Sequence, residues 1–409
     1  MRILYVTPYI PSPIRVRPFN FIKGLSQLGH AITLCVLAPA DELGQPMAIE
    51  PYCEEVYTIP LAAREIMPSL LLAMVTGMPL QAAFGRSSRM ERAIHDRLNQ
   101  DQFDLVHVEH LRASVLGRGI KGVPRVYDSV DCISLLWERA AQSSPQVRTR
   151  LLARLELART GRYESEIVQQ YDRVLATSSE DAKALLSLAA RAPGSQESAT
   201  LQVLPNGVDL DYFHPLDLPV ETNTLVFTGK MSYHANVAAV LHLCQDIMPL
   251  IWRERPDVRL WIVGQNPPAS VRVLERDRRI EVTGYVEDLR PYLARATMAV
   301  SPICYGVGIQ NKVLEPMAMG RPVVASSQVQ GALRIEPGHD LMIADTTAEF
   351  AGCVIRLLDD SALCQKLGLN ARRYMQEHHS WLSIAKELVA IYQETIDVYR
   401  TNTSRHGAD

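Results

Sequence analysis

Length, composition and charge describe a globular chain that is large enough for two domains. The sequence has 409 residues, of which 47% are hydrophobic and 21% are charged, so it can form substantial cores. The net charge of −3 argues against a nucleic-acid-binding protein, which would carry a strong basic patch. The 7 cysteines are scattered and form no CxxC pair, as expected for reduced thiols in a cytosolic protein. No unbroken apolar run reaches the ~20 residues that a membrane span needs.

The chain opens with alternating strand and helix patterns. Residues 3–7 and 32–37 are short apolar runs, typical of buried parallel strands. Between them, residues 19–28 repeat at helical spacing and end at Gly29, a common helix C-cap. This βαβ opening predicts a doubly wound α/β sheet. The loop 8–20 contains no glycine, which excludes the Gly-x-Gly-x-x-Gly turn of a dinucleotide-binding dehydrogenase.

Arg17, in this first loop, has two interpretations that the sequence leaves open. It stands directly before Pro18 and ahead of the predicted helix. A guanidinium in that place could contact a phosphate group or the acceptor substrate. A solvated loop arginine explains the same residue equally well.

Two stretches of the first half are candidates for contact with a membrane. Residues 66–84 are apolar and are interrupted by Pro68, Gly77 and Pro79. We favour a helix packed on the first domain, and the alternative is a surface that faces a lipid-linked acceptor or the bilayer interface. Residues 144–170 form a long helical pattern rich in arginine. Such a face is usually solvated, and attraction to anionic lipid is the less favoured interpretation.

Polar side chains gather where two later strands are predicted to end. His107 and His110 flank the end of one apolar run, and Asp128 and Asp131 follow the end of the next. Ligands of doubly wound sheets bind beyond the carboxyl ends of the strands. We therefore expect these four side chains to face one site. The alternative for Asp128 is the N-cap of the following helix.

A proline-rich segment separates two series of strand and helix patterns. Residues 205–219 contain an Asn-Gly turn and three prolines, which is typical of an interdomain linker. The sequence Asp209-Leu210-Asp211 in this linker imitates a metal-binding Asp-x-Asp motif. Because it follows the Asn-Gly turn, we interpret it as turn chemistry and predict no metal site.

The most informative stretch is residues 306–326, GVGIQNKVLEPMAMGRPVVAS. Its first glycines let a ligand approach the backbone closely. The helix that follows offers unpaired N–H groups and a partial positive charge, which suit phosphate. Lys312 adds a full charge, and Glu315 shares its helix face and suits the two hydroxyls of a ribose. The stretch therefore predicts a nucleotide-diphosphate site.

Three motifs together resemble the GT-B glycosyltransferases, most closely the retaining family 4 (group 1). They are the 306–326 stretch, the sequence LPNGVD at residues 204–209, and the opening strand with its arginine-bearing loop and Leu28-Gly29-His30 helix end. Within the family, the pattern resembles an exopolysaccharide branch associated with exosortase systems.

The resemblance implies an architecture of two Rossmann-like, doubly wound α/β domains that face a cleft. The acceptor-binding domain is expected at residues 1–205 and the nucleotide-sugar-binding domain at 206–380. Residues 381–409 are expected to form a C-terminal helix that crosses back to the first domain, followed by a tail.

The resemblance also implies an activity and its substrates. A retaining transferase would move a sugar from a UDP- or GDP-linked donor to a glycan or lipid-linked acceptor, in the synthesis of a cell-surface polysaccharide or glycoconjugate. It would use no metal ion and no cofactor. Front-face attack, with the leaving diphosphate taking the acceptor's proton, requires no protein nucleophile. The expected location is the cytoplasm of a bacterium, with peripheral association at the inner face of the membrane as an open alternative.

Family motifs carry over onto particular residues of this chain. The donor-site candidates are Gly229, Lys230, Tyr285, Val286, Gly308, Ile309, Asn311, Lys312 and Glu315. The catalytic candidates are Asp128, Asp131, His107 and Lys230. Lys230 directly follows a predicted strand, where the family places a phosphate-binding basic residue.

The sequence departs from the family pattern at three points. Asn236 stands where a second basic residue is usual, and we expect Lys312 to replace it. Val307 stands where a glutamate normally contacts the transferred sugar. Residues 127–131 lack the usual cleft histidine. Two alternatives follow: a nucleotide-sugar epimerase on the same fold, and a non-catalytic GT-B partner subunit.

Overall fold

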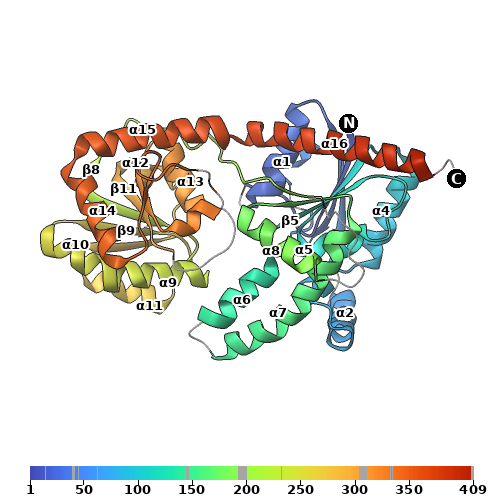
Figure 1. The fold of residues 1–409 in the computed structure, drawn as a ribbon, viewed down its shortest axis with the longest axis horizontal. Helices are drawn as coiled ribbons and strands as arrows, with labels where there is room; N and C mark the ends of the chain where they lie inside the picture. The colour runs from blue at the N-terminus through green and yellow to red at the C-terminus, as the bar shows by residue number, and fades with distance from the viewer. Residues whose placement is uncertain are drawn as a thin grey trace. The chain divides into compact units, whose positions relative to one another are not determined.

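The computed structural model contains two α/β units, each built on one parallel sheet (Figure 1). Unit 1 comprises Met1–Asn206 together with Trp381–Asp409, and unit 2 comprises Gly207–Ser380. The structure describes residues 1–13, 15–38, 42–44, 46–61, 63–143, 147–191, 200–231, 233–303, 311–331, 333 and 335–406.

The sheet of unit 1 has the strand order β3-β2-β1-β4-β5-β6-β7. Its strands are β1 (Arg2–Thr7), β2 (Ala31–Ala38), β3 (Glu55–Pro60), β4 (Leu105–Glu109), β5 (Arg125–Val130), β6 (Arg173–Ala176) and β7 (Leu201–Val203). The order reverses between β1 and β4, which makes the carboxyl ends of these two strands the switch point where ligands of such sheets bind.

Helices cover both faces of this sheet, as the buried apolar strands require. They are α1 (Val16–Gln27), α2 (Ala63–Thr76), α3 (Leu80–Phe84), α4 (Ser88–Gln100), α5 (His110–Ala113), α6 (Ile133–Ser143), α7 (Val147–Ile167), α8 (Ser179–Ala189) and α16 (Trp381–His406). The core on one face is shared with α1 and α16, and the core on the other face with α4, α5, α7 and α8. Helix α1 begins at Val16, earlier than predicted, because Pro18 is tolerated in a first turn.

The last helix, α16, packs against α1 in unit 1, which confirms the predicted return of the chain. The rings of Phe21 and Trp381 meet edge to face at 5.8 Å between centroids. A Cβ atom on Gly24 would lie 2.5 Å from the Cβ of Ala385. Glycine at position 24 is therefore what lets the two helices approach.

The sheet of unit 2 has the order β10-β9-β8-β11-β12-β13. Its strands are β8 (Glu221–Thr228), β9 (Arg259–Val263), β10 (Ile280–Gly284), β11 (Ala296–Ser301), β12 (Val323–Ala325) and β13 (Met342–Ile343). Its helices are α9 (His234–His242), α10 (Met248–Glu254), α11 (Ala269–Arg272), α12 (Arg290–Arg295), α13 (Asn311–Ala318), α14 (Thr347–Asp359) and α15 (Ser361–His378). The switch point lies between β8 and β11. The predicted α/β class with two doubly wound sheets is confirmed.

One helical stretch of the described residues, His234–Glu254, has the length and mean hydropathy (1.2) to cross a membrane. It runs through α9, a π-helical turn at Leu243–Ile247, and α10. Half of it is buried inside the protein, where Leu243 and Ile251 belong to the core of unit 2. A core helix of a folded domain has the same composition.

Candidate functional site

The switch point of unit 2 brings two tight glycine turns together. Gly229 follows β8 and donates its N–H to the carbonyl of Val263 at 3.0 Å. Gly264, which follows β9, has its Cα so close to this turn that a Cβ would stand 1.8 Å from the carbonyl oxygen of Gly229. Gly229 has a φ angle of 153°, and a Cβ there would stand 2.7 Å from Nδ2 of Asn236. Both positions therefore favour glycine, which lets the two turns pack closely against each other.

Two lysines lie near this strand end. The Cε atom of Lys312, on α13, lies 3.5 Å from where a Cβ of Gly229 would be. Lys230, the next residue along from Gly229, is exposed. Neither ammonium group forms an ion pair with a described residue. The structure thus places two lysines where β8 ends and α13 begins, with the carboxyl of Glu315 near Lys312.

Burial shifts the pKa of both charged groups on α13. Desolvation lowers the pKa of Lys312 to about 8, although the nearby carboxyl of Glu315 opposes the shift. Desolvation likewise raises the pKa of Glu315 to about 8, and Lys312 opposes that shift. Both side chains are half-buried. Charge here is costly without a partner, as expected for a site that receives an anion.

Two buried polar atoms beside these lysines have no hydrogen-bond partner among the described residues. They are Oγ1 of Thr228 and Oδ1 of Asn236. The amide nitrogen of Asn236 donates to the carbonyl of Lys230 at 2.9 Å and so holds the turn. An unsatisfied buried polar group costs about 1–3 kcal/mol. Asn236 Oδ1 is an acceptor, so it suits a ligand hydroxyl better than a phosphate oxygen.

Of the other predicted donor-site residues, some lie within the described part of the chain and some do not. Tyr285 and Val286 follow β10, and the Tyr285 side chain is 74% exposed. Because β10 is two strands from β8, these residues begin about 10 Å from the lysine pair. Gly308 and Ile309 lie outside the described residues.

In unit 1, Arg17 is a buried structural residue, so the interpretation as a solvated loop arginine is wrong. It lies in the first turn of α1 and is 4% exposed. Its Nε and Nη2 donate to the two carboxylate oxygens of Asp128 at 2.7 and 3.1 Å. Its Nη1 donates to the carbonyl of Leu204 at 3.1 Å and to Oδ1 of Asn206 at 2.9 Å. These partners occupy the donors that a phosphate would need.

Asp128 lies within β5 and not at a helix N-terminus, so its alternative interpretation as an N-cap is wrong. Strand β5 continues to Val130, and α6 begins only at Ile133. The carboxylate is fully buried. Its bidentate ion pair with Arg17 accounts for a charged group in this core.

His107 is likewise enclosed in the core of unit 1. Its ring stacks on Tyr5 with 4.2 Å between centroids, and the hydroxyl of Tyr392 on α16 is 2.7 Å from its Nδ1. Burial lowers the pKa of His107 to about 4. This placement favours a neutral, structural imidazole over the predicted catalytic role.

A buried carboxyl that the sequence reasoning did not select adjoins these groups. Glu109, the last residue of β4, is fully buried and accepts hydrogen bonds from the hydroxyls of Tyr5 at 2.7 Å and Tyr9 at 3.2 Å. Burial, and next the charge of Asp128, raise its pKa to about 8. The sequence offered one signal for a functional role of Glu109, which is its position at the end of a strand beside the switch point.

The strand ends of unit 1 also carry unusual backbone geometry. His110 and Val130, at the ends of β4 and β5, have φ angles of 71° and 64°. A β-branched valine in this region is strained, and such strain concentrates at functional sites. Asp131, directly after Val130, is half-buried, and burial raises its pKa to about 7. Of the predicted catalytic residues in unit 1, Asp131 is the best placed to meet a ligand.

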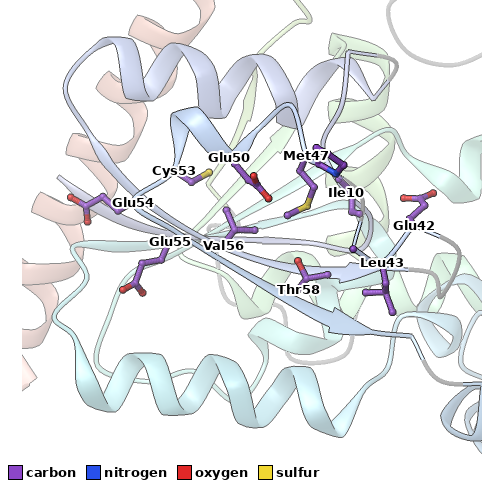
Figure 2. A pocket seen from close by; sticks show the side chains of 12 residues that line it. Ile10, Glu42, Leu43, Met47, Glu50, Cys53, Glu54, Glu55, Val56 and Thr58 are labelled. Carbon is purple, nitrogen blue, oxygen red and sulfur yellow. The ribbon is translucent and has the colours of Figure 1, made fainter.

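A pocket of about 720 Å³ lies beside the edge strand β3 (Figure 2). Its lining includes the carboxylates of Glu42, Glu50, Glu54 and Glu55, which would repel a phosphate. None of the predicted site residues lines it. We therefore place the candidate site at the two switch points and not in this pocket.

The Asp209 side chain stabilises a turn, as the sequence predicted. Its Oδ1 accepts the backbone N–H groups of Asp211 at 3.1 Å and Tyr212 at 3.0 Å, which is an Asx turn. Within the described part of the chain, no group of three or more His, Cys, Asp or Glu side chains could hold a metal ion.

Two family models match the chain, one mainly in unit 1 and the other within unit 2. The model described as "Glycosyltransferase Family 4" matches residues 16–212, and the one described as "Glycosyl transferases group 1" matches residues 222–360. A curated relative, the MMP alpha-(1->4)-mannosyltransferase of Mycolicibacterium hassiacum, is 29% identical over 249 residues. The match covers 57% of this chain and 56% of that protein, so the chain spans little more than half of this relative.

Solved structures share the fold over nearly the whole chain. A sucrose-phosphate synthase from Thermosynechococcus elongatus matches with a TM-score of 0.70 at 17% identity, covering 97% of this chain and 99% of that one. The Anabaena protein Alr3699/HepE, solved in complex with UDP, matches with a TM-score of 0.64 at 16% identity, covering 96% and 100%. With both units matched by glycosyltransferase family models and with these structural neighbours, the chain is a group 1 glycosyltransferase with the GT-B fold.

Proposed function

We propose that this protein transfers a sugar from a nucleotide-diphosphate donor to a glycan or lipid-linked acceptor, with retention of configuration and without a metal ion. The observation that carries the proposal is that Lys312 lies beside Gly229, the residue that precedes Lys230, at the switch point of unit 2. Neither lysine forms an ion pair with a described residue, although the carboxyl of Glu315 is near Lys312. Two fixed cations beside a helix N-terminus suit the diphosphate of such a donor.

These groups suit the chemistry of sugar transfer. As the bond between sugar and diphosphate breaks, negative charge builds on the phosphate oxygens. Lys230 and Lys312 would stabilise that charge, and preorganised groups of this kind do not need to reorganise during the reaction. Glu315 would accept hydrogen bonds from the ribose hydroxyls. The UDP bound to the HepE structure supports a UDP donor, and a GDP donor satisfies the same residues.

The acceptor is proposed to bind at the switch point of unit 1. Asp131, half-buried beside the strained residue Val130, would receive an acceptor hydroxyl. Front-face transfer gives the proton of that hydroxyl to the leaving diphosphate, so Asp131 would orient the acceptor without acting as a nucleophile. Retention is tested directly by the anomeric configuration of the product, which proton NMR reports.

Exposed apolar side chains on unit 1 support a lipid-linked acceptor and peripheral membrane association. On α2, Ala73 is buried, whereas Leu71 and Val75 are 55% and 86% exposed, so one side of the helix is packed and another side exposes apolar side chains. On α7, Leu151 is 70% exposed and Leu155 52%. The backbone N–H of Leu80, at the start of α3, donates to Glu156 of α7 at 3.0 Å, which ties the two regions together. Helices α2 and α7 are labelled in Figure 1.

The membrane proposal is tested by sedimentation with vesicles of an anionic phospholipid. Val75→Asp should reduce the bound fraction severalfold, because it places a charge in the apolar surface. Leu186→Asp, on α8, is the control, since Leu186 is also exposed (44%) but lies on another helix. Equal binding by both variants would contradict the proposal.

The activity is tested by substitution in the donor site. Lys230→Ala and Glu315→Ala should each reduce turnover by roughly 10²-fold or more, as for the loss of one preorganised electrostatic contact. The control is Lys366→Ala, an exposed lysine on α15 of the same unit. Near-normal turnover in both site variants would refute the assignment.

A further inference from the structure

A second pocket lies in unit 2, at the end of its sheet opposite to the proposed donor site. Its volume is about 660 Å³, within the range that holds a small molecule. It opens at the amino ends of β8, β11 and β12, where Asn223, Thr297 and Pro322 line it. The proposed donor site lies at the carboxyl ends of these strands. The two sites are therefore separate, at the two ends of α13.

The lining of this pocket is apolar and positive. Its apolar part includes Met319, Leu357, Leu358 and Leu369. Among the described residues that line it, the charged ones are two arginines, Arg321 and Arg372, and none is a carboxylate. An anion with an apolar body complements such a surface.

The two arginines differ in what they already bind. Nη1 of Arg372 donates to the carbonyls of Phe213 at 2.8 Å and Ala318 at 2.6 Å, so Arg372 holds the structure together. The guanidinium of Arg321 has no hydrogen bond or ion pair with a described residue, and its Nε is buried without a partner. A buried donor on a charged group costs free energy until an acceptor reaches it.

We propose that this pocket is a binding site for a small amphipathic anion, whose single carboxylate or phosphate head pairs with Arg321 and whose apolar body lies on the leucines. The planar guanidinium suits either head group because both offer paired oxygens. The hydroxyl of Thr297 cannot donate to the ligand, because it already donates a hydrogen bond to the carbonyl of Glu221 at 2.9 Å. Arg321 is thus the residue on which recognition depends. The proposal goes beyond sugar transfer and does not rest on it.

Calorimetric titration of the full chain with octanoate, octyl phosphate and octan-1-ol tests the proposal. Octanoate or octyl phosphate should bind with one site per chain, and octan-1-ol at least tenfold more weakly. The comparison of the two anions identifies which head group the pocket prefers. Arg321→Gln should weaken anion binding tenfold or more, whereas Arg373→Gln, an exposed arginine on α15 outside the pocket lining, should leave it unchanged.

A second variant covers the case in which Arg321→Gln fails to fold. Leu369 is 70% exposed at the rim of the pocket, so Leu369→Glu should leave the fold intact and repel the anion. The proposal is overturned if neither anion binds, if octan-1-ol binds as tightly as they do, or if the folded variants in the pocket bind like the unaltered protein.

Discussion

Binding of a nucleoside diphosphate is expected to weaken about tenfold between pH 7 and pH 9, because Lys312 loses its charge in this range. Its lowered pKa of about 8 makes the charged fraction about 0.9 at pH 7 and about 0.1 at pH 9. A ligand that binds only the charged form loses affinity in this ratio. Glu315, whose raised pKa is also about 8, gains negative charge over the same range. That charge repels the diphosphate but makes Glu315 a better acceptor for the ribose hydroxyls, so Lys312 sets the direction of the trend. The terminal phosphate, with a pKa of about 6, is already ionised throughout.

Isothermal titration with UDP and GDP measures this effect. At pH 8, repeating the titration in two buffers of different ionisation enthalpy should show uptake of a proton on binding, since the ligand draws Lys312 to its charged form. Lys312→Arg keeps its charge to beyond pH 12 and should flatten the dependence. Glu315→Gln removes the contribution of the carboxylate alone. An affinity that falls equally in the unaltered protein and in Lys312→Arg would refute the reasoning.

Two further predictions concern the packing that holds the sites. Arg17→Met should destabilise unit 1 by about 3–5 kcal/mol, because it leaves the fully buried Asp128 without its partner. Urea unfolding followed by circular dichroism measures this loss of stability. A loss below about 1 kcal/mol would show that the ion pair is not essential. Gly264→Ala should lower the stability by roughly 1–3 kcal/mol, because the new Cβ clashes with the carbonyl of Gly229. It should also weaken nucleotide binding. A variant with unaltered stability and affinity would contradict the close approach of these two turns.

Most of the strands could be predicted from the sequence because most parallel strands here are short apolar runs. Strand β3 was missed, since the sequence EVYTIP mixes polar and apolar residues and so lacks that signal. The early start of α1 was missed because a proline in a first turn looks like a loop residue in sequence. Boundaries were therefore less predictable than the elements themselves.

Roles that depend on distant partners could not be predicted. Arg17 and Asp128 are 111 residues apart and His107 and Tyr392 are 285 apart, and no local pattern connects either pair. The polar character of Asp128 and His107 suggested catalysis, whereas their partners bury them. By contrast, Lys312 was predicted within a local loop-helix motif whose parts are adjacent in sequence, and the structure places it beside Gly229, in the turn that follows β8.

The central claim is that Lys230 and Lys312 bind the diphosphate of an activated sugar. Titrating UDP and GDP into the unaltered protein and into the double variant Lys230→Gln/Lys312→Gln at pH 7 tests it most directly. One of the two nucleotides should bind, and the double variant should lose at least about 10²-fold in affinity, as for two charge-assisted contacts. If neither nucleotide binds, or if the folded double variant binds as tightly as the unaltered protein, the claim is contradicted.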